Sequence, residues 1–493
     1  FADDLAVLSR DWASMERFLD LVRVFCQLSG LSVQTRKCHG WFLSPSQGSY
    51  VVNNCESWKI GGEPLHMMEP GTEQKYLGIK LDPWRGICKM DSLESVKVWT
   101  KRIDEAPLKP TQRVELLRTY MLPRLLYIAD HTEASAAQLS PIDDVIRAVV
   151  KRWLHLPVAT TNSLIYARCR DGGLGLGRLE MLVPQLQMKR LYRLAQSEDL
   201  VINEICRVGQ VQRKSEKLWK NLGGVVDEVP NILGDGDRAV GSNVPCPMPI
   251  DYRDLEFERW SSLVCQGSGI ALFQDDRISN AWIRERTGMK ERHYIAALKM
   301  RANVVPTREF LCRGTQGQDR SCRKCNAKYE SISHVLGQCP NVQNMRIKRH
   351  NKICDILVKE AKSQGWMVHH EPHLRSSEGM LRKPDLIFVK EGRAIVVDVT
   401  VRFEYHIDGL REAAREKVRY YCNLEEQVKR LTGATDVLFM GFPVGARGKW
   451  YKDNKRLLKL LGVPTARCLW LAKLISRRVV LYSVDMLSTF LNS

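Results

Sequence analysis

The chain has 493 residues, more than one hydrophobic core usually fills, which predicts a multidomain protein of about three domains. An apolar content of 44% in periodic segments excludes a disordered chain, and no apolar run approaches the roughly 18 residues of a membrane-spanning helix. Lys and Arg exceed Asp and Glu by 75 to 56, which is typical of proteins that neutralise nucleic-acid phosphates, although a ribosome-associated or merely basic protein shows the same excess. The odd number of cysteines, 15, without a signal peptide favours a reducing compartment.

The first candidate site lies at the start of the chain, in Phe1-Ala2-Asp3-Asp4. Two adjacent carboxylates on a tight hairpin, Asp3 and Asp4, are suited to holding the magnesium ions of a nucleotide-adding site. A hydrophobic strand and at least one further carboxylate should precede such a turn. We therefore expect the chain to start within a domain.

The segments that follow predict an α+β domain and then a helical one. Apolar residues recur at helical spacing from Asp11 to Leu28, and a glycine follows as a stop signal. Residues 30–38 predict a turn leading into a strand, and residues 76–79 predict the beginning of another short strand. Helical patterns occupy residues 101–156, notably Arg113 to Tyr127, with a proline just before that stretch.

Two glycine-containing stretches interrupt these patterns. Residues 171–177 read DGGLGLG, but they lack the full GxGxxG spacing and the leading strand that a dinucleotide site requires. We therefore reject that interpretation. Residues 223–249 are rich in Gly, Pro, Asp and Asn, which predicts a linker or exposed loop and the main domain boundary.

A candidate metal site follows at Cys322, Cys325, His334 and Cys339. This spacing allows a short knuckle and a following turn to converge on one tetrahedral zinc ion. Because protein side chains would fill all four positions, the predicted role is structural, beside basic residues suited to a nucleic-acid surface. The alternative is a chance cluster in a cysteine-rich chain.

A second pair of carboxylates lies in a predicted β-hairpin over residues 383–398. If Glu391 and Gly392 form the two-residue turn, Asp385 and Asp398 lie directly opposite each other, with Cβ atoms about 5 Å apart. Such a pair repels unless a cation neutralises it, so the hairpin predicts a magnesium site. The alternative is a hairpin in which one aspartate caps a turn and the other is exposed.

A nuclease of the PD-(D/E)xK kind needs this carboxylate pair and a nearby cation. Thr400 occupies the lysine position of that motif, and the predicted replacement is Lys417, on a helix over residues 410–421. The alternative for Lys417 is a solvated lysine on a charged helix. Glu360, on a predicted helix over residues 347–362, is a further acidic candidate. Three histidines before the hairpin are interpreted as surface or satisfied side chains: His369, His370 and His373.

The order of the motifs carries more information than any one of them. They are residues 1–4, 30–38, 76–79, 106–110 (APLKP), 172–175 (GGLG), 292–299, the Cys-Cys-His-Cys knuckle and 383–385. In this order the chain resembles the C-terminal part of the polyprotein of a non-LTR (type-1) retrotransposable element, most closely the R-two type that inserts into ribosomal RNA genes.

The resemblance implies a multidomain α+β fold with particular boundaries. These are the C-terminal part of a reverse-transcriptase palm at 1–95, a helical thumb at 96–200, a linker at 201–290, a zinc-knuckle region at 291–345 and an α/β restriction-like endonuclease at 346–493. The third polymerase aspartate, the fingers, the template-binding region and the N-terminal DNA-binding domain of the family have no match in the chain.

The resemblance also implies two active sites on one polypeptide. Asp3 and Asp4 match polymerase metal ligands, Lys37 matches a lysine near the incoming triphosphate, and residues 76–79 match the primer-grip strand. The matching endonuclease residues are Asp385, Asp398 and Lys417. The implied activity is an RNA-directed DNA polymerase with an endonuclease that nicks target DNA and primes cDNA synthesis from the freed 3′-OH.

The implied cofactors are Mg²⁺ and Zn²⁺, and the implied partners are element RNA, double-stranded target DNA in ribosomal RNA genes and dNTPs, in the nucleus. One or two copies of the protein are both compatible with the resemblance. The alternative is a non-catalytic nucleic-acid-binding zinc protein derived from such an element. A repair or junction-resolving nuclease is disfavoured because it would not explain the motifs before the knuckle.

Overall fold

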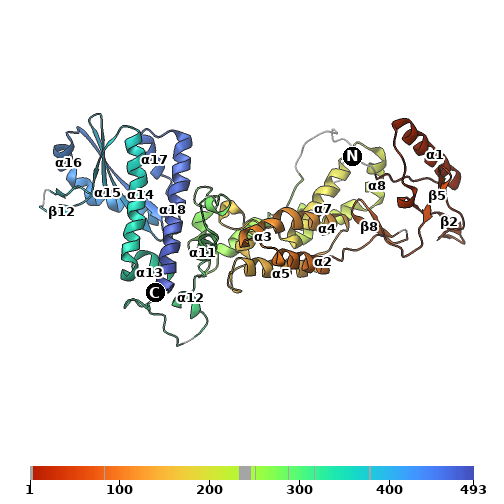
Figure 1. Cartoon of the computed structure of the whole chain (residues 1–493), viewed down its shortest axis with the longest axis horizontal. Coiled ribbons are helices and arrows are strands. Elements are labelled where there is room, and N and C mark those ends of the chain that lie inside the picture. The colour runs from red at the N-terminus through yellow and green to blue at the C-terminus, as the bar shows by residue number, and fades with distance from the viewer. Residues whose placement is uncertain are drawn as a thin grey trace.

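The computed structural model of the chain describes residues 4–82, 84–231, 246–249, 251–286, 288–315, 317–376 and 379–492. Over these residues the protein is elongated, with small β-elements at one end, helices in the middle and a four-stranded sheet at the other end (Figure 1). The predicted mixed α+β class is therefore confirmed. Asp3 lies outside the described residues. None of the described helices has the length and apolar character needed to cross a membrane.

The N-terminal region contains one helix and several short strands around a small core. Its elements are α1 (Trp12–Ser29), η1 (Thr35–Lys37), β1 (His39–Gly40), β2 (Leu43–Ser46), β3 (Ser49–Val52), β4 (Lys59–Ile60), β5 (Glu63–Pro64), β6 (His66–Met67), β7 (Gln74–Tyr76), β8 (Ile79–Asp82) and β9 (Gly86–Ile87). The predicted helix is confirmed as α1. Asp11 caps it by accepting a hydrogen bond from Ser14 N at 2.8 Å, and Gly30 ends it with a φ of 69°.

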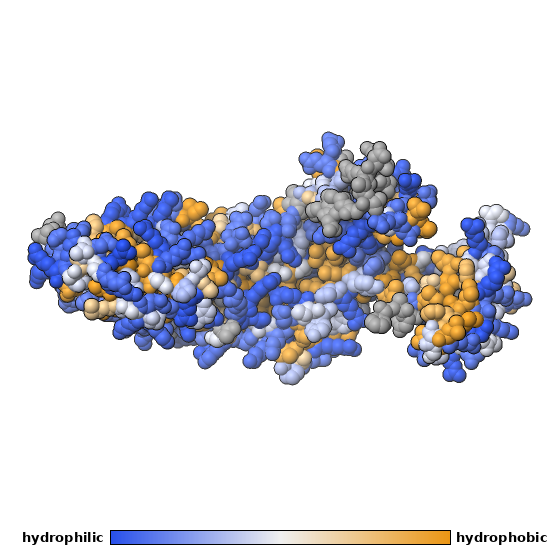
Figure 2. Space-filling model, turned by 90° about the horizontal axis from the view of Figure 1, so that it is seen from above, coloured by the Kyte–Doolittle hydropathy of each residue, from blue (hydrophilic) through white to orange (hydrophobic). Residues whose placement is uncertain are grey.

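One face of α1 stays apolar and exposed. Leu19 packs on Trp58 in the core of this region, but Leu21, Phe25 and Leu28 are 64%, 63% and 85% exposed. Figure 2 shows a large apolar patch at this end of the molecule. The small strands therefore cover only part of the hydrophobic surface that α1 presents.

Residues 30–38 form a turn that leads into a strand, as predicted. Thr35–Lys37 form a 3-10 turn, in which Lys37 N donates to Gln34 O and Cys38 N donates to Thr35 O, both at 2.9 Å. These local bonds use backbone groups that strand pairing would need. Pairing begins only at His39, in β1.

Residues 76–79 form a hairpin turn rather than only the beginning of a strand. Tyr76 of β7 pairs with Ile79 of β8, and the two residues between them, Leu77 and Gly78, have φ of 47° and 84°. Two consecutive left-handed residues match the right-handed twist of paired strands and so favour a tight hairpin.

The helical region begins after this hairpin, as predicted. Its elements are α2 (Leu93–Glu105), α3 (Pro110–Leu116), the π-helical turn η2 (Leu117–Met121), α4 (Leu122–His131), α5 (Ala136–Trp153), α6 (Ser163–Tyr166), η3 (Cys169–Asp171) and α7 (Leu179–Ala195). The continuous helix predicted over residues 113–127 runs through α3, η2 and α4. Pro110 stands at the first helical position, where its missing N–H costs nothing.

The glycine-rich stretch 171–177 is a tightly packed turn. Gly172 has a φ of 97°, and a Cβ on Gly173 would lie 2.3 Å from the carbonyl oxygen of Ala167. The glycines therefore permit a close backbone approach. This packing agrees with the rejection of a dinucleotide site.

The segment expected to be a linker, 201–290, is largely helical where it is described. It contains α8 (Leu200–Val208), α9 (Val211–Asn221), η4 (Val226–Glu228), α10 (Tyr252–Ser261), η5 (Ile270–Phe273) and η6 (Ala281–Ile283). Phe257, Trp260 and Trp282 are buried in a core shared with the helical region and the C-terminal region. These aromatic side chains follow the loop-like residues 223–249, whose described parts, 223–231 and 246–249, contain only the short turn η4.

The C-terminal region carries the main sheet. Its elements are α11 (Glu291–Arg301), α12 (Arg308–Leu311), α13 (Ile332–Gly337), η7 (Pro340–Val342), α14 (Gln343–Ser363), β10 (Met367–His370), β11 (Leu374–Arg375), β12 (Leu381–Arg382), β13 (Leu386–Lys390), β14 (Arg393–Arg402), α15 (Gly409–Tyr421), η8 (Cys422–Leu424), α16 (Glu425–Thr432), β15 (Asp436–Gly445), α17 (Asn454–Leu460) and α18 (Thr465–Asn492). The strand order is β10-β13-β14-β15, and only the last pair is parallel.

Helices cover both faces of this sheet (Figure 1). Phe388 and Val397 pack with residues of α14 and α18, whereas Ile387 and Val396 pack with residues of α15 and α16. The alternation follows from the two-residue period of a strand. It places one helical layer on each side of β13 and β14.

A buried arginine cluster, formed by Arg301, Arg447 and Glu404, joins the sheet to the segments before it. The side chains of Arg447 and Glu404 are fully buried and form an ion pair at 3.2 Å. Arg447 Nη1 donates to Ser268 O at 3.0 Å, and Arg301 Nη1 donates to Asn280 Oδ1. A Cβ on Gly172 would lie 2.9 Å from Arg301 Nη1, so the cluster also contacts the glycine-rich turn.

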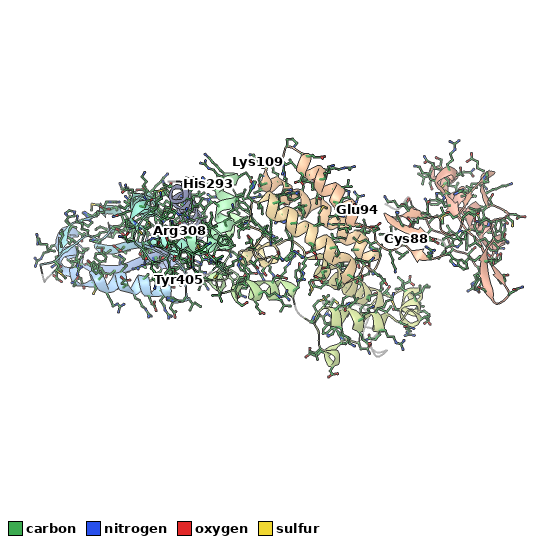
Figure 3. The ribbon with its side chains drawn as sticks, turned by 90° about the horizontal axis from the view of Figure 1, so that it is seen from below. Cys88, Glu94, Lys109, His293, Arg308 and Tyr405 are labelled. Atoms are coloured by element: carbon green, nitrogen blue, oxygen red, sulfur yellow. The ribbon has the colours of Figure 1, made fainter. Side chains whose placement is uncertain are left out.

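Side-chain contacts also connect the middle helices with the C-terminal region. Thr111 of α3 donates to Glu291 of α11, and His293 of α11 lies 3.2 Å from Asp485 of α18. Figure 3 shows His293, Arg308 and Tyr405 on the side of the sheet and Glu94 and Lys109 on the helical region. The C-terminal region therefore packs directly against its neighbours.

Candidate active site and metal cluster

The hairpin formed by β13 and β14 has the predicted register. Leu386 pairs with Val397, and the pairing continues to Lys390 and Arg393. The turn residues, Glu391 and Gly392, have φ of 52° and 74°, which is the two-residue turn that the twist of the strands favours. The residues next to the first pair, Asp385 and Asp398, therefore stand opposite each other at the open end of the hairpin.

The structure brings Lys417 to this carboxylate pair. Lys417 Nζ lies 2.7 Å from Asp398 Oδ2, and the Asp398 carboxylate is buried. Tyr421, one helical turn further along α15, donates from its hydroxyl to Lys383 O at 3.1 Å. Lys417 is thus an inward-facing residue of α15, and the predicted trio of Asp385, Asp398 and Lys417 converges at one place.

The electrostatic surroundings of Asp398 favour a positive charge at this site. Burial and the neighbouring charge of Asp385 raise the pKa of Asp398, and Lys417 offsets only part of that rise. Burial and the charge of Asp398 raise the pKa of Tyr421, so its phenol stays neutral. The Asp398 carboxylate is therefore held in a surrounding that disfavours its charge unless a positive group compensates it.

A divalent cation fits the donor atoms of this site. Asp398 Oδ2 is buried, and the positive group that compensates it in this structure is the Lys417 ammonium at 2.7 Å. Carboxylate oxygens are the ligands that Mg²⁺ prefers. Asp385 and Asp398 would hold such an ion between them.

His350 is a site residue that the sequence did not predict. It lies on α14, and its Nε2 is 3.0 Å from Asp385 Oδ2, while Val399 N donates to the same oxygen at 2.6 Å. Burial lowers the pKa of His350, but its interactions with Asp385 and Cys354 outweigh this and raise it to about 11. A sequence signal did exist, because His350 and Cys354 are four residues apart on one helical face.

The prediction that Glu360 joins this site is wrong. Glu360 is buried on α14 and forms an ion pair with Arg467 of α18 at 3.0 Å. Ten residues of helix, about 15 Å, separate it along α14 from His350. His369 of β10 is half-buried, whereas His370 and His373 are exposed, and the metal-ligand groups found among the described residues do not include these three.

A close contact between α15 and the sheet sets the position of Lys417. Gly441 of β15 pairs with Asp398 of β14, and a Cβ on Gly441 would lie 2.5 Å from the carbonyl oxygen of Ala414. Ala414 is on α15, three residues before Lys417. Glycine at this position therefore allows the helix to approach the strand that carries Asp398.

Gly441→Ala is expected to destabilise the protein by about 1–3 kcal/mol, because the added methyl group overpacks this contact. Thermal melting of the full chain measures the effect. Gly337→Ala is the matched control, since a Cβ there would meet nothing within 4 Å. Equal melting of the two variants would contradict the close-packing argument.

The predicted zinc ligands also converge. One potential ligand atom from each of Cys322, Cys325, His334 and Cys339 lies within 4.8 Å of the others. Cys322 Sγ and Cys339 Sγ are 4.0 Å apart, and Cys325 Sγ is 3.3 Å from His334 Nε2. Tetrahedral zinc with Zn–S bonds of about 2.3 Å requires sulfur atoms about 3.8 Å apart. The four side chains therefore fit a zinc ion.

Local backbone bonds shape this cluster before any metal is considered. Cys322 N donates to Ala327 O, Cys339 N donates to His334 O, and Ser331 caps α13 by accepting from His334 N. Burial lowers the pKa of His334, which favours the neutral imidazole that a zinc ion needs. Local backbone hydrogen bonds therefore hold the four ligand side chains close together.

Cys322→Ser is expected to remove the zinc and to destabilise the protein, because structural zinc supplies folding energy in small units of this kind. Elemental analysis and thermal melting of the purified full chain provide the measurements. The matched control is Cys312→Ser, which replaces a buried cysteine outside the cluster and should retain the metal. Zinc content and melting equal to those of the parent would reject a structural zinc site.

The predicted polymerase residues do not form a comparable cluster among the described residues. Asp4 is exposed, and Lys37 is exposed at the end of η1. The metal-ligand groups of the described residues include neither the Asp4 carboxylate nor any other acidic residue of the N-terminal region. The N-terminal elements α1 to β5, among which η1 with Lys37 falls in the sequence, lie at the end of the molecule opposite to the main sheet (Figure 1).

The fold and these clusters define a multidomain α+β protein with a Cys3His group suited to zinc. No family model matches the chain. A Pol polyprotein from the type-1 retrotransposable element R2 of Popillia japonica is 26% identical over 496 residues, covering 99% of this chain and 97% of the relative. A second Popillia japonica R2 polyprotein is 30% identical, covering 94% of this chain and 61% of the relative. A Pol polyprotein from the type-2 element R2DM of Drosophila melanogaster is 26% identical, covering 93% and 42%.

The chain is thus homologous over nearly its whole length to the Pol polyproteins of R2 non-LTR retrotransposable elements, as the motif order indicated. It spans about half the length or less of some of these relatives, such as the 45% of a Nasonia vitripennis R2 polyprotein.

Proposed function

We propose that the C-terminal region is a magnesium-dependent DNA endonuclease. The supporting observation is the convergence of Asp385, Asp398 and Lys417 at the open end of one hairpin, with the Asp398 carboxylate buried. Homology to R2 Pol polyproteins gives the substrate class, nucleic acid, and the net charge of +19 suits it.

In this proposal each side chain has a separate task. Asp385 and Asp398 hold the cation, which when bound supplies an activated water and charge neutralisation. Lys417 leaves its ion pair with Asp398 and places its ammonium against the phosphate that gains negative charge. Tyr421 remains neutral, donates to Lys383 O and lies beside Asp398.

The proposal extends to the whole cycle of an element polyprotein. The endonuclease would nick double-stranded target DNA, in ribosomal RNA genes by homology, and the freed 3′-OH would prime cDNA synthesis from element RNA and dNTPs in the nucleus. Asp3, Asp4 and Lys37 would serve the polymerase with Mg²⁺. The corresponding regions are palm 1–95, thumb 96–200, linker 201–290, knuckle 291–345 and endonuclease 346–493.

A second candidate function rests on the Cys3His group. Exposed basic residues lie beside this cluster at Arg320 and Lys328. Such a surface holds nucleic-acid backbones without any catalysis. The protein would then be a nucleic-acid-binding zinc protein derived from an element.

Nicking of supercoiled DNA by the full chain, with and without Mg²⁺, separates the two functions. The full chain is required because residues 346–493 bond to residues that precede them. Arg447 donates to Ser268 O, and Trp450 N donates to Ser279 Oγ at 2.8 Å. Magnesium-dependent nicking supports the endonuclease. DNA binding without nicking by a folded, zinc-loaded protein would favour the binding function.

A further inference from the structure

We propose that His350 is a positioning residue that orients Asp385 for metal binding by donating a hydrogen bond from Nε2 to Oδ2. The inference rests on the proposed endonuclease and deepens it. It gives a task to a helix, α14, that packs on the face of the sheet opposite to the helix carrying Lys417.

The contacts of the imidazole determine the direction of this hydrogen bond. His350 Nε2 lies 3.0 Å from Asp385 Oδ2 and 3.2 Å from Val399 O. A carbonyl oxygen only accepts, so Nε2 must carry the proton that faces both oxygens. An Nε2 that donates has no lone pair for a metal, and His350 therefore acts through Asp385.

The other side of the ring is also held. His350 Nδ1 lies 3.2 Å from Asn351 Oδ1 and 3.9 Å from Cys354 Sγ, one helical turn further along α14. The helix itself is anchored by the buried side chains of Ile353 and Leu357. The imidazole is thus fixed at both nitrogens and presented by a rigid element.

These contacts leave Asp385 with two unlike oxygens. Oδ2 accepts from both His350 Nε2 and Val399 N, the latter at 2.6 Å. Its lone pairs are therefore occupied, and rotation of the carboxylate would break two hydrogen bonds. Oδ1 is the oxygen that remains for a cation shared with Asp398. Ligands held in this way by outer partners typically lose about 10- to 100-fold in metal affinity when the partner is removed.

The group of His350, Cys354 and Asp385 has potential ligand atoms within 4.8 Å of one another, so direct metal ligation by the imidazole is the competing arrangement. A matched pair of variants separates the two. His350→Gln keeps a side-chain N–H donor at similar length, whereas His350→Met keeps length and volume but has no donor. The thioether of the methionine is also a poor ligand for hard cations.

The test measures Mn²⁺ binding to the zinc-loaded full chain by electron paramagnetic resonance, together with the Mg²⁺ dependence of nicking. His350→Met should weaken Mn²⁺ binding and raise the half-saturating Mg²⁺ concentration by about 10- to 100-fold. His350→Gln should stay close to the parent in both. Melting and DNA affinity without metal should be the same in all three proteins, and Asp355→Asn, at an exposed residue of α14, provides a neighbouring control.

Three results would overturn the proposal. Unchanged Mn²⁺ binding by His350→Met would show that the imidazole does not orient Asp385. Equal loss in His350→Gln and His350→Met would show that the imidazole itself binds the metal. A lowered melting temperature in His350→Met, restored by His350→Gln without recovery of metal binding, would assign His350 to stability. A parent that binds Mn²⁺ at this site but does not nick DNA would reject the endonuclease while leaving the comparison of the His350 variants valid.

Discussion

Asp398→Asn is expected to abolish magnesium-dependent nicking while leaving DNA binding intact. The substitution removes the charge of a buried ligand, and metal ions contribute several kcal/mol of transition-state stabilisation, so a loss on the order of 10³-fold is expected. The basic surface that binds phosphates does not change. Nicking rates and gel-shift affinities of the full chain provide the two measurements.

The matched control for this variant is Asp436→Asn, which changes an exposed aspartate at the other end of the sheet that pairs with Arg393. It should nick at the rate of the parent. Nicking by Asp398→Asn at the parental rate would reject the carboxylate pair as the active site. Equal loss of nicking and DNA affinity would show that Asp398 supports the fold rather than the chemistry.

Arg447→Met is expected to destabilise the protein by about 3–5 kcal/mol. Arg447 and Glu404 are buried without exposure to solvent, and removal of one partner leaves the other as an uncompensated buried charge. Chemical denaturation followed by tryptophan fluorescence measures the change, because Trp260 and Trp282 are buried in the core that the same region shares.

Arg393→Met is the matched control, since the Arg393–Asp436 pair is 50% and 60% exposed and should contribute less than about 1 kcal/mol. The double variant Arg447→Met/Glu404→Met should recover much of the lost stability, because apolar pairs often replace buried ion pairs at little cost. If Arg447→Met and Arg393→Met unfolded at the same denaturant concentration, the buried ion pair would not join the regions.

The parts of the candidate site that depend on local sequence were predictable. The register of the hairpin follows from the two-residue turn at Glu391 and Gly392, which fixes every pair between the strands. The metal cluster follows from ligand spacing within 18 residues, Cys322 to Cys339. Lys417 required a resemblance to a known family, because nothing in its helix distinguishes it from its charged neighbours.

The parts that depend on tertiary packing were not predictable. His350 reaches Asp385 across 35 positions of sequence and from the opposite face of the sheet. Glu360 lies on the same helix as His350 and carries a carboxylate, which is a suitable metal ligand. It lies about three turns away from His350, however, and pairs with Arg467. The packing of Phe257, Trp260 and Trp282 was likewise hidden by neighbouring loop-like composition.

The buried arginine cluster fixes the distance between the helical region and the sheet. Arg301 contacts the glycine-rich turn of the helical region, and Arg447 holds Glu404 at the end of the sheet that carries the carboxylate pair. Under the proposed function, a duplex held by the helical region would be cut at a fixed number of base pairs from that contact.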